Sequence, residues 1–306
     1  MNYYFAPMEG LTDRVFRQLH HRFFGGVDRY YMPFFSPTVH RSLTTRESRE
    51  LPKADSAGFT AVPQVLTKVP EDFLWAAEVL RDLGYGEINL NLGCPSGTVV
   101  AKGKGSGMLR DPDGLRRFLD QIFSASSLPV SAKTRLGLEA PEEFPAILEI
   151  LNCYPIREVT IHPRVRRQFY EGEVHREWFD YALENSRNPL CFNGDIRTLS
   201  DVRALRERYP SLNAVMIGRG LIADPGMLCG GTRLDTLEAF LNALMDTYEV
   251  EFSGCRNALF RMKEHWAYLH ERFEGSDRLW KKMRKTTDAA EFRRLSGELL
   301  HTCPMR

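Results

Sequence analysis

The chain has 306 residues with 43% hydrophobic and 26% charged residues, and its formal net charge is only +1. This balance excludes a protein that attracts polyanions by net charge alone. No apolar stretch is long enough to cross a bilayer, and no charged-then-apolar leader precedes the first predicted strand, so we expect a cytosolic protein with no membrane partner.

The six cysteines show neither a CxxC motif nor the spacing of a zinc site. A disulfide framework is not expected in a chain of this size without an export signal. The sequence therefore predicts no bound metal. The cysteines are Cys94, Cys153, Cys191, Cys229, Cys255 and Cys303.

Eight apolar, β-branched runs bounded by turn residues predict strands. In chain order they are Tyr3 to Met8, Asp28 to Phe34, Thr60 to Leu66, Glu87 to Leu92, Pro129 to Arg135, Glu158 to His162, Pro189 to Asn193 and Asn213 to Gly218. The long polar segment Ser36 to Gly58 predicts a loop with a helical turn.

Amphipathic segments of helical length separate most of these strands. They are Asp13 to Phe24, Glu71 to Leu83, Pro112 to Ser124, Glu142 to Leu151 and Leu199 to Tyr209, and the third follows the start signal Asp111-Pro112. Strand-helix alternation over about 220 residues predicts a parallel (β/α)8 TIM barrel.

The remaining residues read as a small all-α helical bundle. Its predicted helices are Leu234 to Tyr248, Arg256 to Phe273, Asp277 to Lys285 and Ala289 to Leu300, with breaks at Ser253-Gly254 and at Gly275. The predicted domains are therefore a barrel over residues 1–233 and a bundle over residues 234–306.

Charge is unevenly distributed along the bundle. Residues 236–255 carry four acids and no Lys or Arg, whereas residues 256–285 carry nine basic residues against four acids. A solvated helix face is the ordinary explanation of such a run. Interleaved aromatic residues favour a nucleic-acid surface instead, and they are Phe260, Trp266, Tyr268, Phe273 and Trp280.

In a parallel barrel the reactive residues lie at the carboxyl ends of the strands. Almost every predicted strand here ends on a polar, charged or glycine residue, which stability does not require. These residues are Pro7, Met8, Glu9, Gln64, Asn91, Cys94, Lys133, Arg135, His162, Arg164, Asn193, Gly194, Asp195, Gly218 and Arg219.

The turn Asn91-Leu92-Gly93-Cys94-Pro95 follows the fourth predicted strand. A lone cysteine is most often a small buried hydrophobe. On this turn, at the reactive end of a barrel, the thiol of Cys94 is a candidate proton donor.

Three strand ends together fit a flavin mononucleotide. Gly218-Arg219-Gly220 follows the last strand, where barrels often bind phosphate, and Arg219 adds a charge-assisted fork. Asn193-Gly194-Asp195 offers a glycine and an acceptor for ribityl hydroxyls. Lys133 is a fixed positive charge that suits an electron-rich ring. Each motif alone also fits an ordinary turn or a solvated charge.

Seven segments in the same order resemble the tRNA-dihydrouridine synthase family. They are Ala6 to Asp13, Asn91 to Pro95, Gly103 to Gly107 with Leu109 and Asp111-Pro112, Lys133 to Gly137, His162-Pro163-Arg164 with Gln168 and Tyr170, Asn193 to Ile196, and Met216 to Gly220. Two residues depart from the family pattern, because many members have alanine in place of Glu9 and glycine or serine in place of Pro163.

The resemblance implies an FMN-dependent enzyme that consumes NADPH or NADH and reduces the C5–C6 bond of selected uridines in tRNA. Hydride would pass from flavin N5 to C6, and Cys94 would give the proton to C5. The implied cofactor residues are Pro7, Met8, Glu9, Gln64, Lys133, His162, Asn193, Gly194, Asp195, Gly218 and Arg219.

For the substrate, the resemblance implies that the helical bundle binds tRNA. Asn91 and Arg164 are candidates to bind the uracil carbonyls, and either could instead brace the loop that carries Cys94. Further candidates to bind tRNA are Lys104, Arg166, Lys281, Lys282, Arg284 and Lys285. A monomer is favoured.

Two alternatives stay open at this point. A barrel of the dihydroorotate dehydrogenase type also handles a pyrimidine ring with FMN, but it has no use for a basic helical tail. An RNA-binding protein whose barrel has lost its chemistry would not need Cys94 together with a full flavin set.

Overall fold

The computed structural model describes all residues, 1–306, and the chain divides into two compact units. The first unit comprises Met1–Pro7, Asp28–Asp195 and Tyr209–Met216. The second comprises Met8–Val27, Ile196–Arg208 and Ile217–Arg306.

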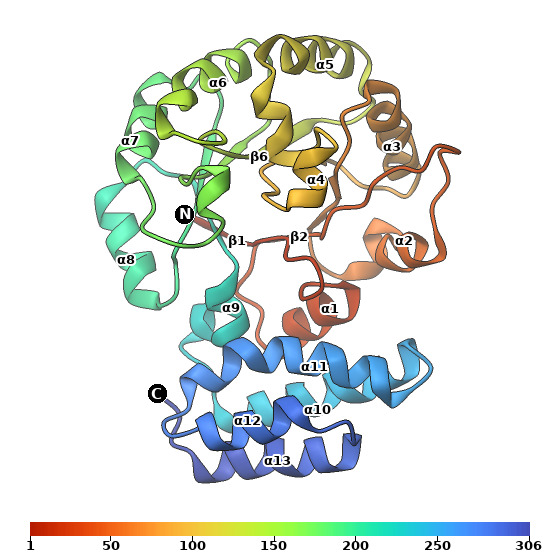
Figure 1. The fold of residues 1–306 in the computed structure, drawn as a ribbon, viewed down its shortest axis with the longest axis vertical. Helices are drawn as coiled ribbons and strands as arrows, with labels where there is room; N and C mark the ends of the chain where they lie inside the picture. Colours follow the sequence, from red (N-terminus) through yellow and green to blue (C-terminus); the bar gives the residue numbers. More distant parts are fainter. The chain divides into compact units, whose positions relative to one another are not determined.

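The first unit is built on a parallel sheet whose strands follow one another around a barrel (Figure 1). The strand order is β3-β2-β1-β9-β8-β7-β6-β5-β4. The strands are β1 (Asn2–Phe5), β2 (Arg29–Tyr31), β3 (Ala61–Val62), β4 (Gln64–Val65), β5 (Ile88–Leu92), β6 (Val130–Arg135), β7 (Val159–His162), β8 (Leu190–Asn193) and β9 (Ala214–Ile217).

The barrel closes through a strand that is divided at Pro63. On one side of this proline β3 pairs with β2, and on the other side β4 pairs with β5. Proline has no N–H to give to a sheet, which explains the division. Its carbonyl oxygen still accepts from Asn89 N at 2.9 Å, so β3 and β4 together act as one barrel strand.

Helices of the first unit surround these strands in Figure 1, except α4, which lies inside the ring of helices in that view. They are α2 (Thr45–Glu50), α3 (Pro70–Asp82), α4 (Gly97–Ala101), α5 (Pro112–Ala125), α6 (Phe144–Leu151) and α7 (Arg176–Asn185), with 3₁₀ turns η1 (Ala54–Ala57), η2 (Gly105–Arg110), η3 (Pro141–Glu143) and η4 (Arg166–Gln168). Helix α5 begins as its sequence predicts: Asp111 accepts from Gly114 N at 2.9 Å, and Pro112 occupies the first turn.

Polar groups bond to one another at the amino end of the barrel interior. The hydroxyl of Tyr4 donates to Glu158 at 3.2 Å, and the hydroxyl of Tyr31 donates to the same carboxyl at 3.5 Å. Next to this group, the guanidinium nitrogens of Arg29 and Arg157 each lie 3.0 Å from Oε2 of Glu87. Burial raises the pKa of Glu158 to about 7.

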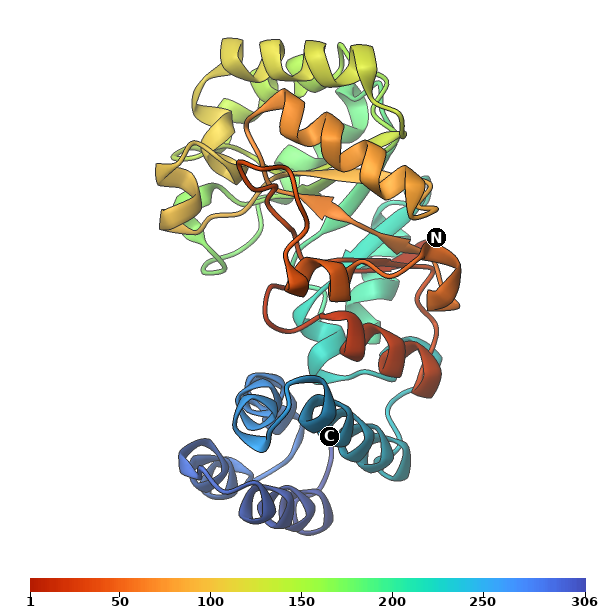
Figure 2. The same ribbon diagram turned by 90° about the vertical axis from the view of Figure 1, so that its right-hand side faces the viewer.

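The second unit is helical. It contains α1 (Arg14–Phe23), α8 (Leu199–Arg208), α9 (Arg219–Ala223), η5 (Met227–Cys229), α10 (Leu234–Glu251), α11 (Cys255–Leu269), η6 (His270–Arg272), α12 (Asp277–Lys285) and α13 (Ala289–Thr302). Helix α10 packs along α11 and α12 packs along α13, and α1 packs on α10 (Figure 2).

Aromatic rings form much of the core of this unit. The His265 ring stacks on Phe16 at 4.8 Å between centroids, and its Nε2 lies 3.2 Å from the Tyr248 hydroxyl. That hydroxyl donates to Asp13 at 3.0 Å. Asp13 also caps α1 by accepting from Phe16 N. Burial lowers the pKa of His265 to about 3, so the ring is neutral.

The predicted fold class is confirmed, because a parallel barrel precedes a helical region. All eight predicted strands are present, the third as β3 and β4. The chain breaks before α11 and before α12 as predicted, at Ser253-Gly254 and at Gly275. Helices α4 and α7 were not predicted. None of the helices combines the length and the apolar character that crossing a bilayer requires.

Candidate active site

A chain of side-chain amides crosses the barrel interior between β4 and β6. Gln64 donates to Asn89 at 2.7 Å, and Asn89 donates to the Ser131 hydroxyl at 2.8 Å. Asn91 donates back to Gln64 at 2.7 Å. These amides are buried and bonded to one another, so they form a preorganised floor beneath the loops that follow the strands.

Asn91 also shapes the turn that carries Cys94. Its side-chain oxygen accepts from Gly93 N at 3.0 Å and from Cys94 N at 2.9 Å. These contacts support bracing of the Cys94 turn, which is one of the two roles that the sequence left open.

The segment Gly103–Gly107 packs against the other side of this turn. Ser106 donates to the Cys94 carbonyl oxygen through its N–H at 3.2 Å and through its hydroxyl at 2.8 Å. At Gly105 the backbone is left-handed, with φ +57, and an added Cβ would lie 2.9 Å from the Cys94 Cβ. The glycine is therefore required for the close approach of η2. The Cys94 side chain itself is partly exposed.

Lys133 lies on β6 directly opposite Asn91 on β5. Burial lowers the pKa of its amine to about 7, and the charge of Arg135 contributes in the same direction. The sequence interpretation treats Lys133 as a fixed positive charge. In the structure that charge depends on what lies beside it, and an anionic neighbour would stabilise it.

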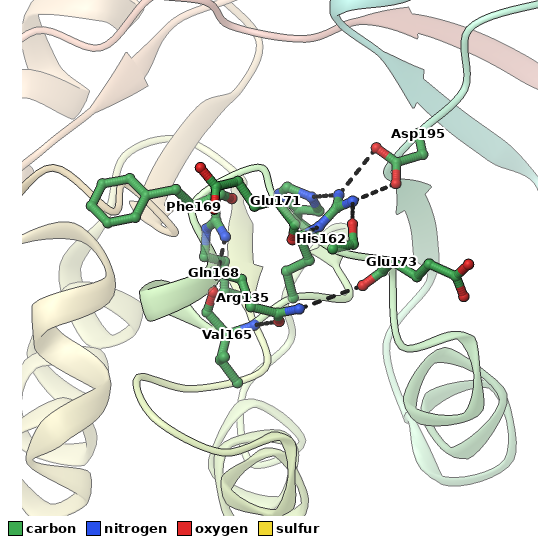
Figure 3. A network of polar contacts seen from close by, with 10 residues as sticks. Arg135, His162, Val165, Gln168, Phe169, Glu171, Glu173 and Asp195 are labelled. Carbon is green, nitrogen blue, oxygen red and sulfur yellow. Dashed lines mark hydrogen bonds and ion pairs between the residues drawn. The ribbon is translucent and has the colours of Figure 1, made fainter.

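His162 at the end of β7 is bonded to Arg164, and Arg164 is bonded to Asp195 after β8. Figure 3 labels His162 and Asp195 in this network. Arg164 Nη1 lies 3.1 Å from His162 Nε2 and 3.1 Å from Asp195 Oδ1. Three predicted residues thus meet, but two of them are occupied with each other. The predicted contacts of Arg164 with uracil and of Asp195 with a cofactor stay predictions.

Arg135 fixes the loops above the site. It donates to the carbonyl oxygens of Gly93 at 3.0 Å, Val165 at 3.1 Å and Phe169 at 2.7 Å. One guanidinium therefore joins the Cys94 turn to the loop after β7. Figure 3 shows Arg135 with Val165 and Phe169 of that loop. Arg166 adds a bond from the same loop to Pro95 O at 3.2 Å.

Asn193, the last residue of β8, and Gly194, directly after it, serve packing as well. Asn193 donates its amide to Met216 O at 2.8 Å, which joins β8 to β9. A Cβ on Gly194 would lie 2.8 Å from Val174 and 3.4 Å from the His162 ring. The glycine predicted for a cofactor is thus already required by the protein's own packing.

The other predicted cofactor residues are divided between the units. Pro7 ends the first segment of the first unit, whereas Met8, Glu9, Gly218 and Arg219 belong to the second. Arg219 begins the short helix α9 directly after Gly218. Lys104 precedes η2 and is partly buried.

The predicted tRNA cations of the tail lie on α12. Lys281, Lys282, Arg284 and Lys285 are exposed, whereas Leu279 and Met283 face the core. The aromatic argument is corrected by the structure: Trp266 and Phe273 are 0% and 3% exposed and form core, because a small bundle needs large apolar side chains. Phe260, at 60%, is exposed.

Sequence reasoning missed the parts of the site that depend on pairing between distant positions. The bracing by Arg135 and by Ser106 and the bond between Arg164 and Asp195 belong to this group. A basic residue at the end of a buried strand was the available signal for Arg135. The structure has no cluster of three or more His, Cys, Asp or Glu side chains that could hold a metal ion.

Comparison with known proteins gives a family match over nearly the whole chain. The model of the family described as dihydrouridine synthase matches residues 4–297. A probable tRNA-dihydrouridine synthase of Rhizobium leguminosarum is 31% identical over 277 residues, covering 88% of this chain and 84% of the relative. The tRNA-dihydrouridine synthase B of Proteus vulgaris is 32% identical over 72% of this chain and 67% of the relative.

Solved structures share the barrel at much lower identity. A morphinone reductase mutant in complex with tetrahydroNAD has a TM-score of 0.52 and 11% identity, covering 74% of this chain and 85% of that one. A variant of NCR from Zymomonas mobilis has a TM-score of 0.50 and 12% identity, covering 73% and 83%. At this identity the likeness concerns the fold.

Proposed function

Because the chain belongs to the dihydrouridine synthase family, we propose that this enzyme reduces specific uridines of tRNA to 5,6-dihydrouridine with FMN and NADPH or NADH. The observation that carries the proposal is the braced Cys94 turn at the carboxyl end of β5, one strand away from Lys133. The carboxyl end is where parallel barrels perform their chemistry.

Cys94 is the proposed general acid. An ordinary thiol has a pKa near 8.5, so it is mostly protonated at neutral pH and can give a proton to C5 of the uracil. Asn91 and Ser106 fix the backbone on both sides of the thiol, which supports a defined direction for that transfer.

The donor groups of the first unit fit an anionic heteroaromatic cofactor. Burial lowers the pKa of the Lys133 amine to about 7, so an anionic ligand beside it would favour its charged form. Gln64 and His162 are buried on other strands of the same barrel. FMN, when bound, would supply the hydride. Pro7, Asn193, Gly194 and Asp195 complete the proposed set from this unit, and Met8, Glu9, Gly218 and Arg219 remain the proposed residues of the second.

The first experiment tests cofactor and activity together. Purified protein should be yellow or become yellow with FMN, should release FMN and not FAD on denaturation, and should form dihydrouridine in unmodified tRNA when NADPH is supplied. A colourless protein that FMN does not reconstitute would contradict the proposal. Free uracil and orotate serve as the substrates of the rival small-molecule activity.

The proposed tRNA surface includes the exposed cations of α12. Replacing Lys281, Lys282, Arg284 and Lys285 by alanine should weaken tRNA binding and flatten its salt dependence, each lost phosphate contact lowering the log–log slope by roughly 0.7 to 0.9. The matched control is Arg294→Ala, because Arg294 on α13 is already paired with Glu291 and Glu298. An unchanged salt slope would assign tRNA binding to the barrel loops that carry Lys104 and Arg166.

A further inference from the structure

The structure assigns Arg164 and Asp195 a positioning role: together they hold the His162 ring in the neutral tautomer that carries its proton on Nδ1. The protonation of the ring follows from contacts within the first unit alone. The inference rests on the proposed function only for the identity of the ligand that this proton meets.

Every N–H of the Arg164 guanidinium has a partner. Nε donates to Glu171 O at 3.2 Å, Nη2 donates to Gly172 O and to Asp195 Oδ2, and Nη1 donates to Asp195 Oδ1 at 3.1 Å. The fifth N–H is the one directed at His162 Nε2, at 3.1 Å. The guanidinium therefore has no donor left for a substrate carbonyl.

This inventory fixes the role of the histidine nitrogen. A guanidinium only donates, so His162 Nε2 must accept, and an imidazole nitrogen accepts only when it carries no proton. The ring is then neutral with its proton on Nδ1. A cationic ring would lose this bond and would place a second positive charge against a guanidinium whose side chain is 1% exposed.

Asp195 keeps the guanidinium in place. Its two oxygens bind two different nitrogens of Arg164, the forked geometry that is strongest between these groups. To reach that position the backbone of Asp195 adopts a left-handed conformation with φ 46, which is unfavourable for a residue with a side chain. The ion pair offsets this strain.

The surroundings of the ring restrict it further. Tyr170 stacks on His162 with 6.1 Å between ring centroids, and Gly194 leaves just enough room for the Cδ2 edge. A ring held in this way presents a neutral N–H donor. The Nδ1–H can bind only an acceptor, and where FMN meets it in the proposed enzyme this is a carbonyl, hydroxyl or phosphate oxygen of the flavin nucleotide.

The test is nitrogen-15 NMR of the full-length protein labelled at histidine, with and without FMN. The chain has 8 histidines, so the His162 signals are assigned by their loss in His162→Gln. We expect Nε2 in the range of an unprotonated ring nitrogen and Nδ1 in the range of a protonated one. A protonated Nε2 in the parent protein would overturn the inference.

Variants then test the two positioning residues. In Arg164→Met the two nitrogen signals should shift toward each other, because both tautomers become populated, and Arg164→Lys should restore part of the parent pattern. Asp195→Asn should give a smaller shift in the same direction. If Arg164→Met does not fold, as judged by circular dichroism, the nitrogen-15 spectra of Asp195→Asn and Arg164→Lys decide whether the two residues set the His162 tautomer. Folded variants with the parent pattern would contradict the assignment.

Arg135→Lys is the matched control, since Arg135 is also buried and braces the same loop through backbone oxygens and the Tyr170 ring, but makes no bond to a nitrogen of His162. It should leave the His162 tautomer unchanged; a shift as large as that of Arg164→Met would mean that general loosening of the loop is the cause. Dihydrouridine formation is assayed in parallel. A parent protein inactive on tRNA that still shows the expected tautomer would sink the proposed function and leave this inference standing.

Discussion

The two ends of the barrel interior are both polar, but their side chains bond to different partners. At the amino end they bond to one another, as Tyr4 and Tyr31 do to Glu158. At the carboxyl end some also bond to one another, but others bond to the backbone of loops, as Asn91 does to Cys94 N and Arg135 to Gly93 O. The first arrangement ties strands together, and the second shapes the loops above them.

The difference separates stability from function within one barrel. Damage at the amino end should lower the free energy of unfolding and leave the chemistry of the folded molecules intact. Damage at the carboxyl end should impair the chemistry and leave the free energy of unfolding largely unchanged, because loop positions determine where reactive groups lie.

Replacing Cys94 by alanine should give the largest effect and fall on function alone. Turnover on tRNA should decrease by about 10² to 10⁴-fold, the usual contribution of a general acid, while FMN content and its reduction by NADPH stay at the parent level. Stopped-flow absorbance separates flavin reduction from tRNA turnover. Reduction of tRNA at the parent rate would show that Cys94 is structural and that the proton has another source.

Glu158→Ala should give the opposite result. It leaves the hydroxyls of Tyr4 and Tyr31 buried without their acceptor, so the free energy of unfolding should decrease by about 3 kcal/mol. Urea unfolding measures this loss, and Glu158→Gln, which keeps an acceptor, should lose less. Turnover per folded molecule should match the parent, and a tenfold lower value would break the separation between the two ends.

A pH dependence of opposite sign at the two ends sharpens the comparison further. The pKa of Glu158 is raised from 4.5 to about 7, so its contribution to stability is present below pH 4.5 and is lost as the pH rises to 7. The pKa of Lys133 is lowered from 10.5 to about 7, so its contribution grows as the pH rises from 7 to 10.5.

Two variants of the FMN-free protein separate the pH dependence due to Glu158 from that due to Lys133. Relative to the parent, Glu158→Gln should flatten the dependence of unfolding free energy on pH below 7, and Lys133→Met should flatten it above 7. Subtracting the parent curve removes groups common to all three proteins, among them His20 and His265, whose burial lowers the pKa of each to about 3. If the unfolding free energy of all three proteins depends on pH in the same way, Glu158 and Lys133 do not contribute pH-dependent stability at the two ends.

The sequence predicted the barrel because strand and helix periodicities are local. Runs such as Glu158 to His162 are short, apolar and bounded by turn residues, and Asp111-Pro112 marks a helix start by itself. Helix α7 (Arg176–Asn185) was not predicted from the sequence, because only its residues Phe179 and Ala182 are buried and two apolar positions are too few to show a helical period.

The positions of the candidate residues were predictable, but their partners were not. Strand ends located Asn91, His162 and Asp195, since the carboxyl ends of parallel strands meet on one side of the sheet. That Asp195 binds Arg164, 31 residues away, depends on the register of β7 and β8 and on the course of two loops. Pairing of this kind is a tertiary property that no local pattern contains.

The division of one barrel strand at Pro63 has a consequence for how the barrel opens. Here β3 pairs with β2 and β4 pairs with β5 across a residue with no amide hydrogen, and on the β2 side β4 is bonded through Phe35, which lies outside the strands. Each half is only two residues long. Fluctuations that part the sheet should therefore begin at this seam. Amide hydrogens of Val62 and Val65 would then exchange with solvent before those of β5 to β7, although both valines are buried.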